Sequence, residues 1–319
     1  MRLPVSILRP LVLGAVFLGI GASVSAEAPP VLDEVVVTGE RTGPGLWHMH
    51  RPGADVWIMA SMSPLPKGIT WRSKQLEGIL QHTDRVLVPK PFEVGIVRVL
   101  WLLITERDLL MVQGGKRLKD VMPPALYARF SVQRAKYEDK SDKWERYRPI
   151  IAAAFLQQAA FHSVDLSTRL DLGAAVRMLA KRYRVPVEEL KIAGMHDVMD
   201  ALKTLPPATE NACVEASLVT VERDLKRLVD RAQAWATGNV ERIAQLGEPA
   251  EVDACRAALD QGAGAKELIA QLRRTWLETI EKYFGAGGTT VAVVNMDMLL
   301  EKGGLLDELR AKGYEVDSP

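Results

Sequence analysis

The chain has no excess of charge of either sign, and it is poor in aromatic residues. Among its 319 residues, 41 lysines and arginines balance 40 aspartates and glutamates, which leaves a net charge of +1. Binding to nucleic acid relies on a strong positive field, which this balance does not provide. Only six Phe and six Tyr accompany the seven Trp, so an aromatic platform for single strands is not indicated. The composition therefore predicts no nucleic-acid partner.

Long apolar runs are scarce, and the first of them predicts export. Arg2 supplies a basic start, residues 11–20 are apolar, and Val-Ser-Ala at 24–26 offers the small residues that a signal peptidase requires. We predict a signal peptide over residues 1–26, cleaved after Ala26, and a periplasmic or secreted protein. An uncleaved anchor is the alternative, but the run is short for a bilayer. A second apolar run, 94–110, is interrupted by charges and predicts a core helix, so no integral membrane span is expected in the mature chain.

The chain contains only two cysteines, Cys213 and Cys255. Export would place them in an oxidising compartment, where a disulfide persists. A bridge would close a loop of about forty residues and stabilise the fold by roughly 3–4 kcal/mol in the chain-entropy model. Two buried free thiols are the alternative. We predict the disulfide, because an exposed thiol is a liability in that compartment.

Residues 27–45 contain several prolines and glycines and are expected to form a flexible leader. Within it, an extended and β-branched stretch resembles the TonB box of outer-membrane transporters; its central residues are Glu34, Val35, Val36, Val37 and Thr38. Such a segment can add as a strand to the edge of a partner's sheet, which suggests TonB as a partner. The alternatives are an edge strand of this protein or an inherited leader without a partner.

Hydrophobic spacing predicts an α/β protein. Strands are predicted over residues 46–49, 54–59, 85–88, 289–294 and 314–316, and helices over 75–83, 147–162, 172–183, 211–238, 266–284 and 305–312. The first strands form a hairpin across Arg51-Pro-Gly-Ala54, and the succession of strand, helix and strand up to residue 88 is typical of a parallel crossover. We expect a central, partly parallel sheet wrapped by helices, with a helical subdomain in the middle of the chain.

Several segments between residues 46 and 316 occur in an order and spacing typical of one family. They are Leu46-Trp47, the strand at Val56, Asp84–Val88, Arg148–Ile151, Lys191–Gly194, Trp276–Ile280, and the ending Gly303-Gly-Leu-Leu with Gly313-Tyr-Glu-Val. On these residues the chain resembles the TraB/GumN family, which includes the Tiki metalloproteases. The resemblance implies one such domain over residues 46–319. It also implies that the strands at Val56 and Thr289 lie close together, because the family's site is assembled from both.

In that family a Gly-x-x-His motif ends each of these two strands, and the histidines hold a divalent metal. Ser63 and Met298 stand at the two histidine positions of this chain. Pro89 stands where the family has a glutamate, and His196 stands in place of the glutamate of a Gly-Leu-Glu motif. A hydroxyl and a thioether are poor ligands for such a metal, and a proline side chain cannot ligate. The resemblance thus implies a degenerate site without metal or cofactor.

The same positions contain material for a different chemistry. If the two strand ends face each other, Ser61, Ser63, Asn295 and Asp297 would line one cleft, with His196 at a family active-site position. Ser, His and Asp together permit nucleophilic catalysis, although no Gly-x-Ser-x-Gly elbow surrounds either serine. The alternative is that these polar residues line a non-catalytic cleft or cap strands and helices.

A histidine pair is a separate feature. His48 and His50 lie two residues apart, on one face of a predicted strand, which suits a metal. The alternative is an incidental pair beside a flexible leader, and no carboxylate partner for them is evident in the sequence.

These observations support three hypotheses. The leading one is an exported, catalytically degenerate TraB/GumN-like protein that binds a protein or another ligand in the cell envelope. The second is a hydrolase with an altered, metal-free mechanism that uses Ser63 or Ser61 with His196 and Asp297. The third is an accessory to TonB-linked uptake, engaged through Glu34–Thr38.

Overall fold

A computed structural model describes residues 43–71, 74–90, 107–137, 142–168, 170, 172–191, 195–247 and 250–319. The predicted signal peptide and the TonB-box-like segment Glu34–Thr38 lie outside the described residues. Most of the apolar run 94–110 lies outside them as well, and its last residues form α3 (Arg107–Leu110). Within the described ranges, no helix combines the length and apolar character that crossing a membrane requires.

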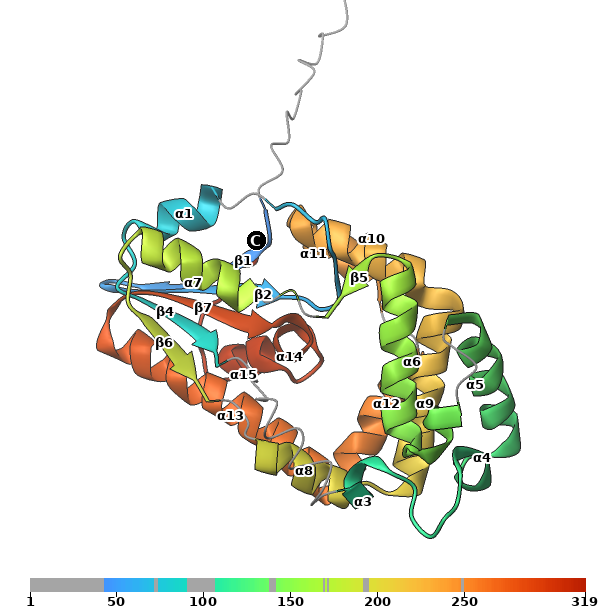
Figure 1. The fold of residues 1–319 in the computed structure, drawn as a ribbon. Helices are drawn as coiled ribbons and strands as arrows, with labels where there is room; N and C mark the ends of the chain where they lie inside the picture. The colour runs from blue at the N-terminus through green and yellow to red at the C-terminus, as the bar shows by residue number, and fades with distance from the viewer. Residues whose placement is uncertain are drawn as a thin grey trace, which may run out of the picture. The chain divides into compact units, whose positions relative to one another are not determined.

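The centre of the fold is a five-stranded sheet with the order β1-β2-β7-β4-β6 (Figure 1). Its strands are β1 (Leu46–Arg51), β2 (Ala54–Ser61), β7 (Gly288–Asn295), β4 (Arg85–Pro89) and β6 (Val187–Leu190). β1 is antiparallel to β2, and all the other neighbouring pairs are parallel. The expected α/β fold with a partly parallel sheet is therefore confirmed, as is the hairpin formed by the first two strands.

The last strand, β7, inserts between β2 and β4. Ser61 lies opposite Asn295 in the β2–β7 pair, and Arg85 lies opposite Thr290 in the β4–β7 pair. Residues 290–294 are fully buried, as expected for a central parallel strand that is covered on both faces. The first and last strand regions lie side by side, as the family resemblance implied.

Helices cover both faces of this sheet. α1 (Lys74–Leu80) connects β2 to β4 and packs against α7 (Leu172–Arg182), which contacts β4. α13 (Ala263–Ala286) packs on β2 and β7 from the opposite face (Figure 1). Both sets bury one apolar stripe, as amphipathic helices do on a sheet. The predicted crossover over residues 54–88 exists, but β7 separates its two strands.

The middle of the chain forms a helical subdomain. Its elements are α4 (Leu118–Val121), α5 (Pro124–Tyr137), η1 (Asp142–Arg146), α6 (Pro149–Ser163), α9 (Pro207–Val219), the π-helical segment η2 (Thr220–Asp224) and α12 (Ala250–Gln261). α10 (Leu225–Ala236) and α11 (Val240–Leu246) continue from η2, and their buried residues belong to the core of the sheet. α9, η2 and α10 together correspond to the long helix predicted over 211–238. The subdomain has its own apolar core, in which Phe130, Leu156 and Leu218 are buried. The disulfide predicted between Cys213 and Cys255 is present and joins α9 to α12.

The prediction of a final strand over residues 314–316 is wrong. Residues 314–316 have no strand pairing, and only the next residue, Asp317, forms an isolated bridge, with His48. Tyr314 and Val316 pack against the sheet core instead, and the Tyr314 ring lies edge-on to Phe284 with the centroids 5.6 Å apart. The alternation of apolar and polar residues there reflects packing onto the core rather than strand pairing.

Candidate functional site

The carboxyl ends of β2 and β7 open onto a cavity of about 340 Å³. After β2 the chain passes through Ser63 into the short strand β3 (Leu65–Pro66), and after β7 it enters α14 (Met296–Leu300). α6, α10 and α12 complete the wall of the cavity. Ligands of open α/β sheets bind outside the carboxyl ends of the strands, so this cavity is the candidate site.

The structure brings Ser63 and Asp297 to this cavity but gives Ser61 and Asn295 other partners. The Ser61 hydroxyl donates a hydrogen bond to the Val294 carbonyl at 3.1 Å. The Asn295 side chain accepts hydrogen bonds of 2.9 and 3.1 Å from two backbone N–H groups of α14. Asn295 is therefore the N-cap of this helix. Of the four polar residues expected to line one cleft, only Ser63 and Asp297 line this cavity.

Met298 and Pro89 are not among the described residues that line this cavity. Met298 packs against the sheet core and lines a different cavity, beside α12 and α13. Pro89 is the last residue of β4, opposite Leu190 of β6. His196 lies in the first turn of α8 (Met195–Lys203), which packs against α13 and α3; its side chain is not among those described. Ser63 and Met298 thus line two different cavities.

Three arginines in the cavity wall were missed by the sequence analysis. Arg227 and Arg231 come from α10, and Arg256 comes from α12. The Arg227 Nη2 atom lies 2.7 Å from the Asp224 carboxylate, and the Arg231 Nη2 atom lies 3.7 Å from the Asp297 carboxylate. The Arg256 Nε atom lies 3.6 Å from the Glu301 carboxylate, so each of the three guanidinium groups has a carboxylate beside it. The four-residue spacing of Arg227 and Arg231, on one face of a helix, was the available signal.

A buried indole holds the arginine-bearing helix against the sheet. Trp235 of α10 is 1% exposed, and its Nε1–H donates a 2.7 Å hydrogen bond to the carbonyl of Ala60 in β2. The pairing of β1 with β2 ends at Leu46 and Met59. The indole therefore binds the carbonyl of the next residue of β2, which β1 does not cover. Trp235 follows Arg231 by four residues and therefore lies on the same helix face. The hydrogen bond ties the helix that carries Arg227 and Arg231 to the end of β2.

The donor set that the described residues give this cavity does not fit a divalent metal. Such an ion needs deprotonated nitrogen, oxygen or sulfur ligands. Asp224 and Asp297 offer carboxylates, but each has an arginine beside it. Ser63 adds only a hydroxyl group, which is a poor ligand at neutral pH.

The fold and the site define an α/β protein with a polar cavity at the carboxyl ends of two central parallel strands. The model of the TraB/PrgY/gumN family matches residues 45–318. The chain therefore belongs to the TraB/PrgY/gumN family. Comparisons with curated proteins and with solved structures gave no match.

Proposed function

We propose that this chain is an exported, catalytically degenerate member of its family that acts as a binding module in the cell envelope. Its ligand-binding site would be the cavity at the carboxyl ends of β2 and β7. One observation carries the proposal: the cavity at the carboxyl ends of β2 and β7 is lined by Ser63 and three arginines. Export and the leader enter this proposal from sequence patterns alone.

The arginines favour a small ligand with a carboxylate or phosphate group. A guanidinium group presents several donors in a planar fork that matches these anions. The Arg231 side chain is 12% exposed and that of Arg227 is 25% exposed, so an anion would meet them in a partly desolvated setting. Hydrogen bonds between charged groups are stronger there than in water. The ligand would compete with Asp297 for Arg231, because the Arg231 Nη2 atom lies 3.7 Å from the Asp297 carboxylate.

Calorimetric titration of the full chain with inorganic phosphate and with citrate tests this proposal. At least one probe should bind, and Arg231→Gln should weaken binding by roughly 10- to 100-fold, as expected when one charge-assisted hydrogen-bond partner is removed. Arg274→Gln is the matched control, because Arg274 is exposed and pairs with Glu267 outside the cavity. Ser63→Trp should also weaken binding, because a bulky side chain at this exposed position would occupy the cavity without disturbing the core. No binding of either probe, or equal binding by all variants, would contradict the proposal.

The metal-free serine hydrolase remains the alternative enzyme hypothesis, but no geometric observation favours it. Among the described residues, no histidine lines the cavity with Ser63 and Asp297. The Ser61 hydroxyl is engaged with the Val294 carbonyl. A fluorophosphonate probe that labels Ser63 or Ser61 in wild type, with loss of labelling in the corresponding alanine variant, would establish the hydrolase and overturn the binding module.

Export and TonB contact are independent parts of the proposal. N-terminal sequencing of the protein from the periplasm or the medium should give Glu27 as the first residue, because cleavage is predicted after Ala26. A TonB partner would be supported if crosslinking to TonB is lost on deletion of residues 32–41. Absence of a crosslink with the intact chain would exclude this partner.

A further inference from the structure

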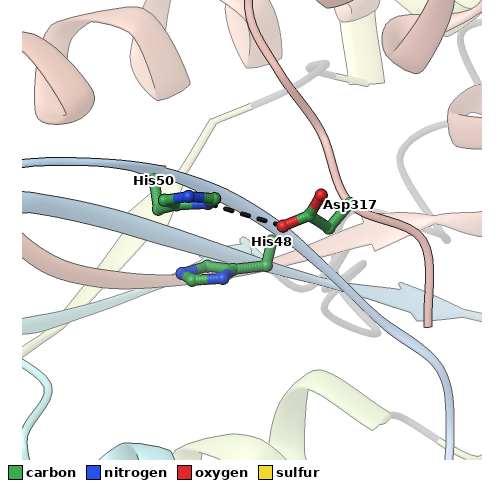
Figure 2. Close-up of side chains that lie close together, drawn as sticks. All are labelled: His48, His50 and Asp317. Carbon is green, nitrogen blue, oxygen red and sulfur yellow. Dashed lines mark ion pairs between the residues drawn. The ribbon is translucent and has the colours of Figure 1, made fainter.

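The edge strand β1 presents two histidines beside a carboxylate from the far end of the chain (Figure 2). His48 and His50 share one face of β1, because side chains alternate along a strand. The backbone N–H groups of His48 and Asp317 each donate to the other's carbonyl, at 3.1 and 2.9 Å. This bridge places the Asp317 side chain next to both imidazoles. The sequence analysis found no carboxylate partner for this pair, and the tertiary structure supplies one.

The spacing of the three side chains is close to that of a metal site. One ligand atom from each of His48, His50 and Asp317 can be chosen so that all lie within 4.8 Å of one another. The His50 Nδ1 atom is 3.5 Å from a carboxylate oxygen of Asp317. Ligand atoms around tetrahedral Zn²⁺ lie about 3.4 Å apart, given metal–ligand distances of about 2.1 Å. The His50–Asp317 pair already has this spacing, and the ligand atom of His48 lies within 4.8 Å of both.

A second carboxylate orients His48. Its Nε2 atom lies 2.8 Å from the carboxylate of Asp55 on β2, and its ring stacks on Trp57 with the centroids 3.7 Å apart. When Nε2–H donates to Asp55, the Nδ1 atom keeps its lone pair for a metal. Metal-binding histidines commonly have such a carboxylate partner, which sets the tautomer and raises the basicity of the ligand.

We propose that His48, His50 and Asp317 form a binding site for a divalent transition-metal ion, of which Zn²⁺ is the representative. Two imidazoles and one carboxylate suit Zn²⁺, Ni²⁺ or Cu²⁺, whereas Ca²⁺ and Mg²⁺ require mostly oxygen ligands. Three protein ligands leave a coordination position for water. The ion would fasten the C-terminal segment to β1. This site is separate from the cavity at the ends of β2 and β7, and neither depends on the other.

Calorimetric titration of Zn²⁺ into the full chain, prepared without a polyhistidine tag and treated with chelator, tests the proposal. Wild type should bind one ion at the site, and His50→Gln or Asp317→Asn should lower the affinity at least tenfold. Asp55→Asn should lower it by roughly 10- to 100-fold, the range for partners of metal ligands. His82→Gln is the matched control, because His82 is an exposed histidine elsewhere in the chain and should leave binding unchanged.

Two further measurements separate specific binding from general cation attraction. In the first, excess Mg²⁺ should not displace Zn²⁺. In the second, Zn²⁺ should raise the melting temperature of wild type but not that of His50→Gln, because a ligand that binds only the folded state stabilises that state. His50 and Asp317 are exposed, so their variants are expected to fold, which circular dichroism would verify. The proposal is overturned if wild type does not bind Zn²⁺, if His50→Gln binds like His82→Gln, or if Mg²⁺ competes equally.

Discussion

Replacing Trp235 by Phe should remove the hydrogen bond that ties α10 to the end of β2. The indole nitrogen donates to the Ala60 carbonyl at 2.7 Å, and both residues are buried. A phenyl ring keeps most of the apolar contact but leaves this carbonyl without the donor. Trp276→Phe is the matched control. Trp276 is equally buried, at 1% exposed, and belongs to the same apolar core. Among the described contacts its indole has no recorded hydrogen bond.

The two variants remove the same atoms from similarly buried sites, so the costs of the resulting cavities should be similar. The difference between them then isolates the hydrogen bond. Leaving a buried acceptor unsatisfied costs about 1–3 kcal/mol, so Trp235→Phe should lose that much more free energy of unfolding than Trp276→Phe. With an m-value of about 3 kcal/mol/M, the urea midpoints should differ by about 0.3–1 M. Far-UV circular dichroism is the suitable signal, because both substitutions change tryptophan fluorescence.

Equal urea midpoints for the two variants would refute this reasoning. The hydrogen bond would then contribute no net stability, and α10 would be held by apolar packing alone. Anion binding provides a second readout. If Trp235 positions Arg231 in the cavity, Trp235→Phe should weaken the binding of phosphate or citrate, and Trp276→Phe should leave it unchanged.

Two further predictions concern stability. The double variant Cys213→Ser/Cys255→Ser should lose about 4 kcal/mol of unfolding free energy in the chain-entropy model, because the bridge joins residues 42 positions apart; a loss below about 1 kcal/mol in urea denaturation would contradict the loop-closure argument. Gly288→Ala should destabilise by at least about 1–2 kcal/mol, since φ is +77° and a Cβ atom would lie 2.3 Å from the Asp84 carboxylate. Gly68→Ala has no such neighbour and should change the urea midpoint little; equal effects of the two alanines would be inconsistent with this account.

Most of the sheet could be predicted from local patterns. The turn at Pro52-Gly53 between two apolar strands indicated the hairpin, and the apolar run at 290–294 indicated a buried strand. β6 was missed, because its Val-Glu-Glu-Leu sequence has two exposed glutamates and acquires strand geometry only by pairing with β4. The final strand was predicted wrongly for the converse reason. Its alternating pattern is satisfied by packing rather than by pairing.

The candidate site was only partly predictable. Ser63 and Asp297 were identified because the family resemblance marks the ends of β2 and β7. The arginines of α10 and α12 were not identified, because the four-residue spacing of Arg227 and Arg231 is equally common on a solvated helix face. The same holds for Asp317, which acquires a partner only when the C-terminal segment bridges to His48.

By itself, the sequence determined the α/β class, the pairing of two cysteines, the hairpin and the family membership. These properties depend on periodicity, turn residues and the order of short segments along the chain. Only the tertiary structure decided that β7 lies between β2 and β4, that Arg231 faces Asp297, and that Asp317 approaches the histidines of β1. The physical reason is that the local sequence pattern around a residue determines whether the residue is buried. Which residues it contacts depends on the strand order and on the packing of helices that are far away in the sequence.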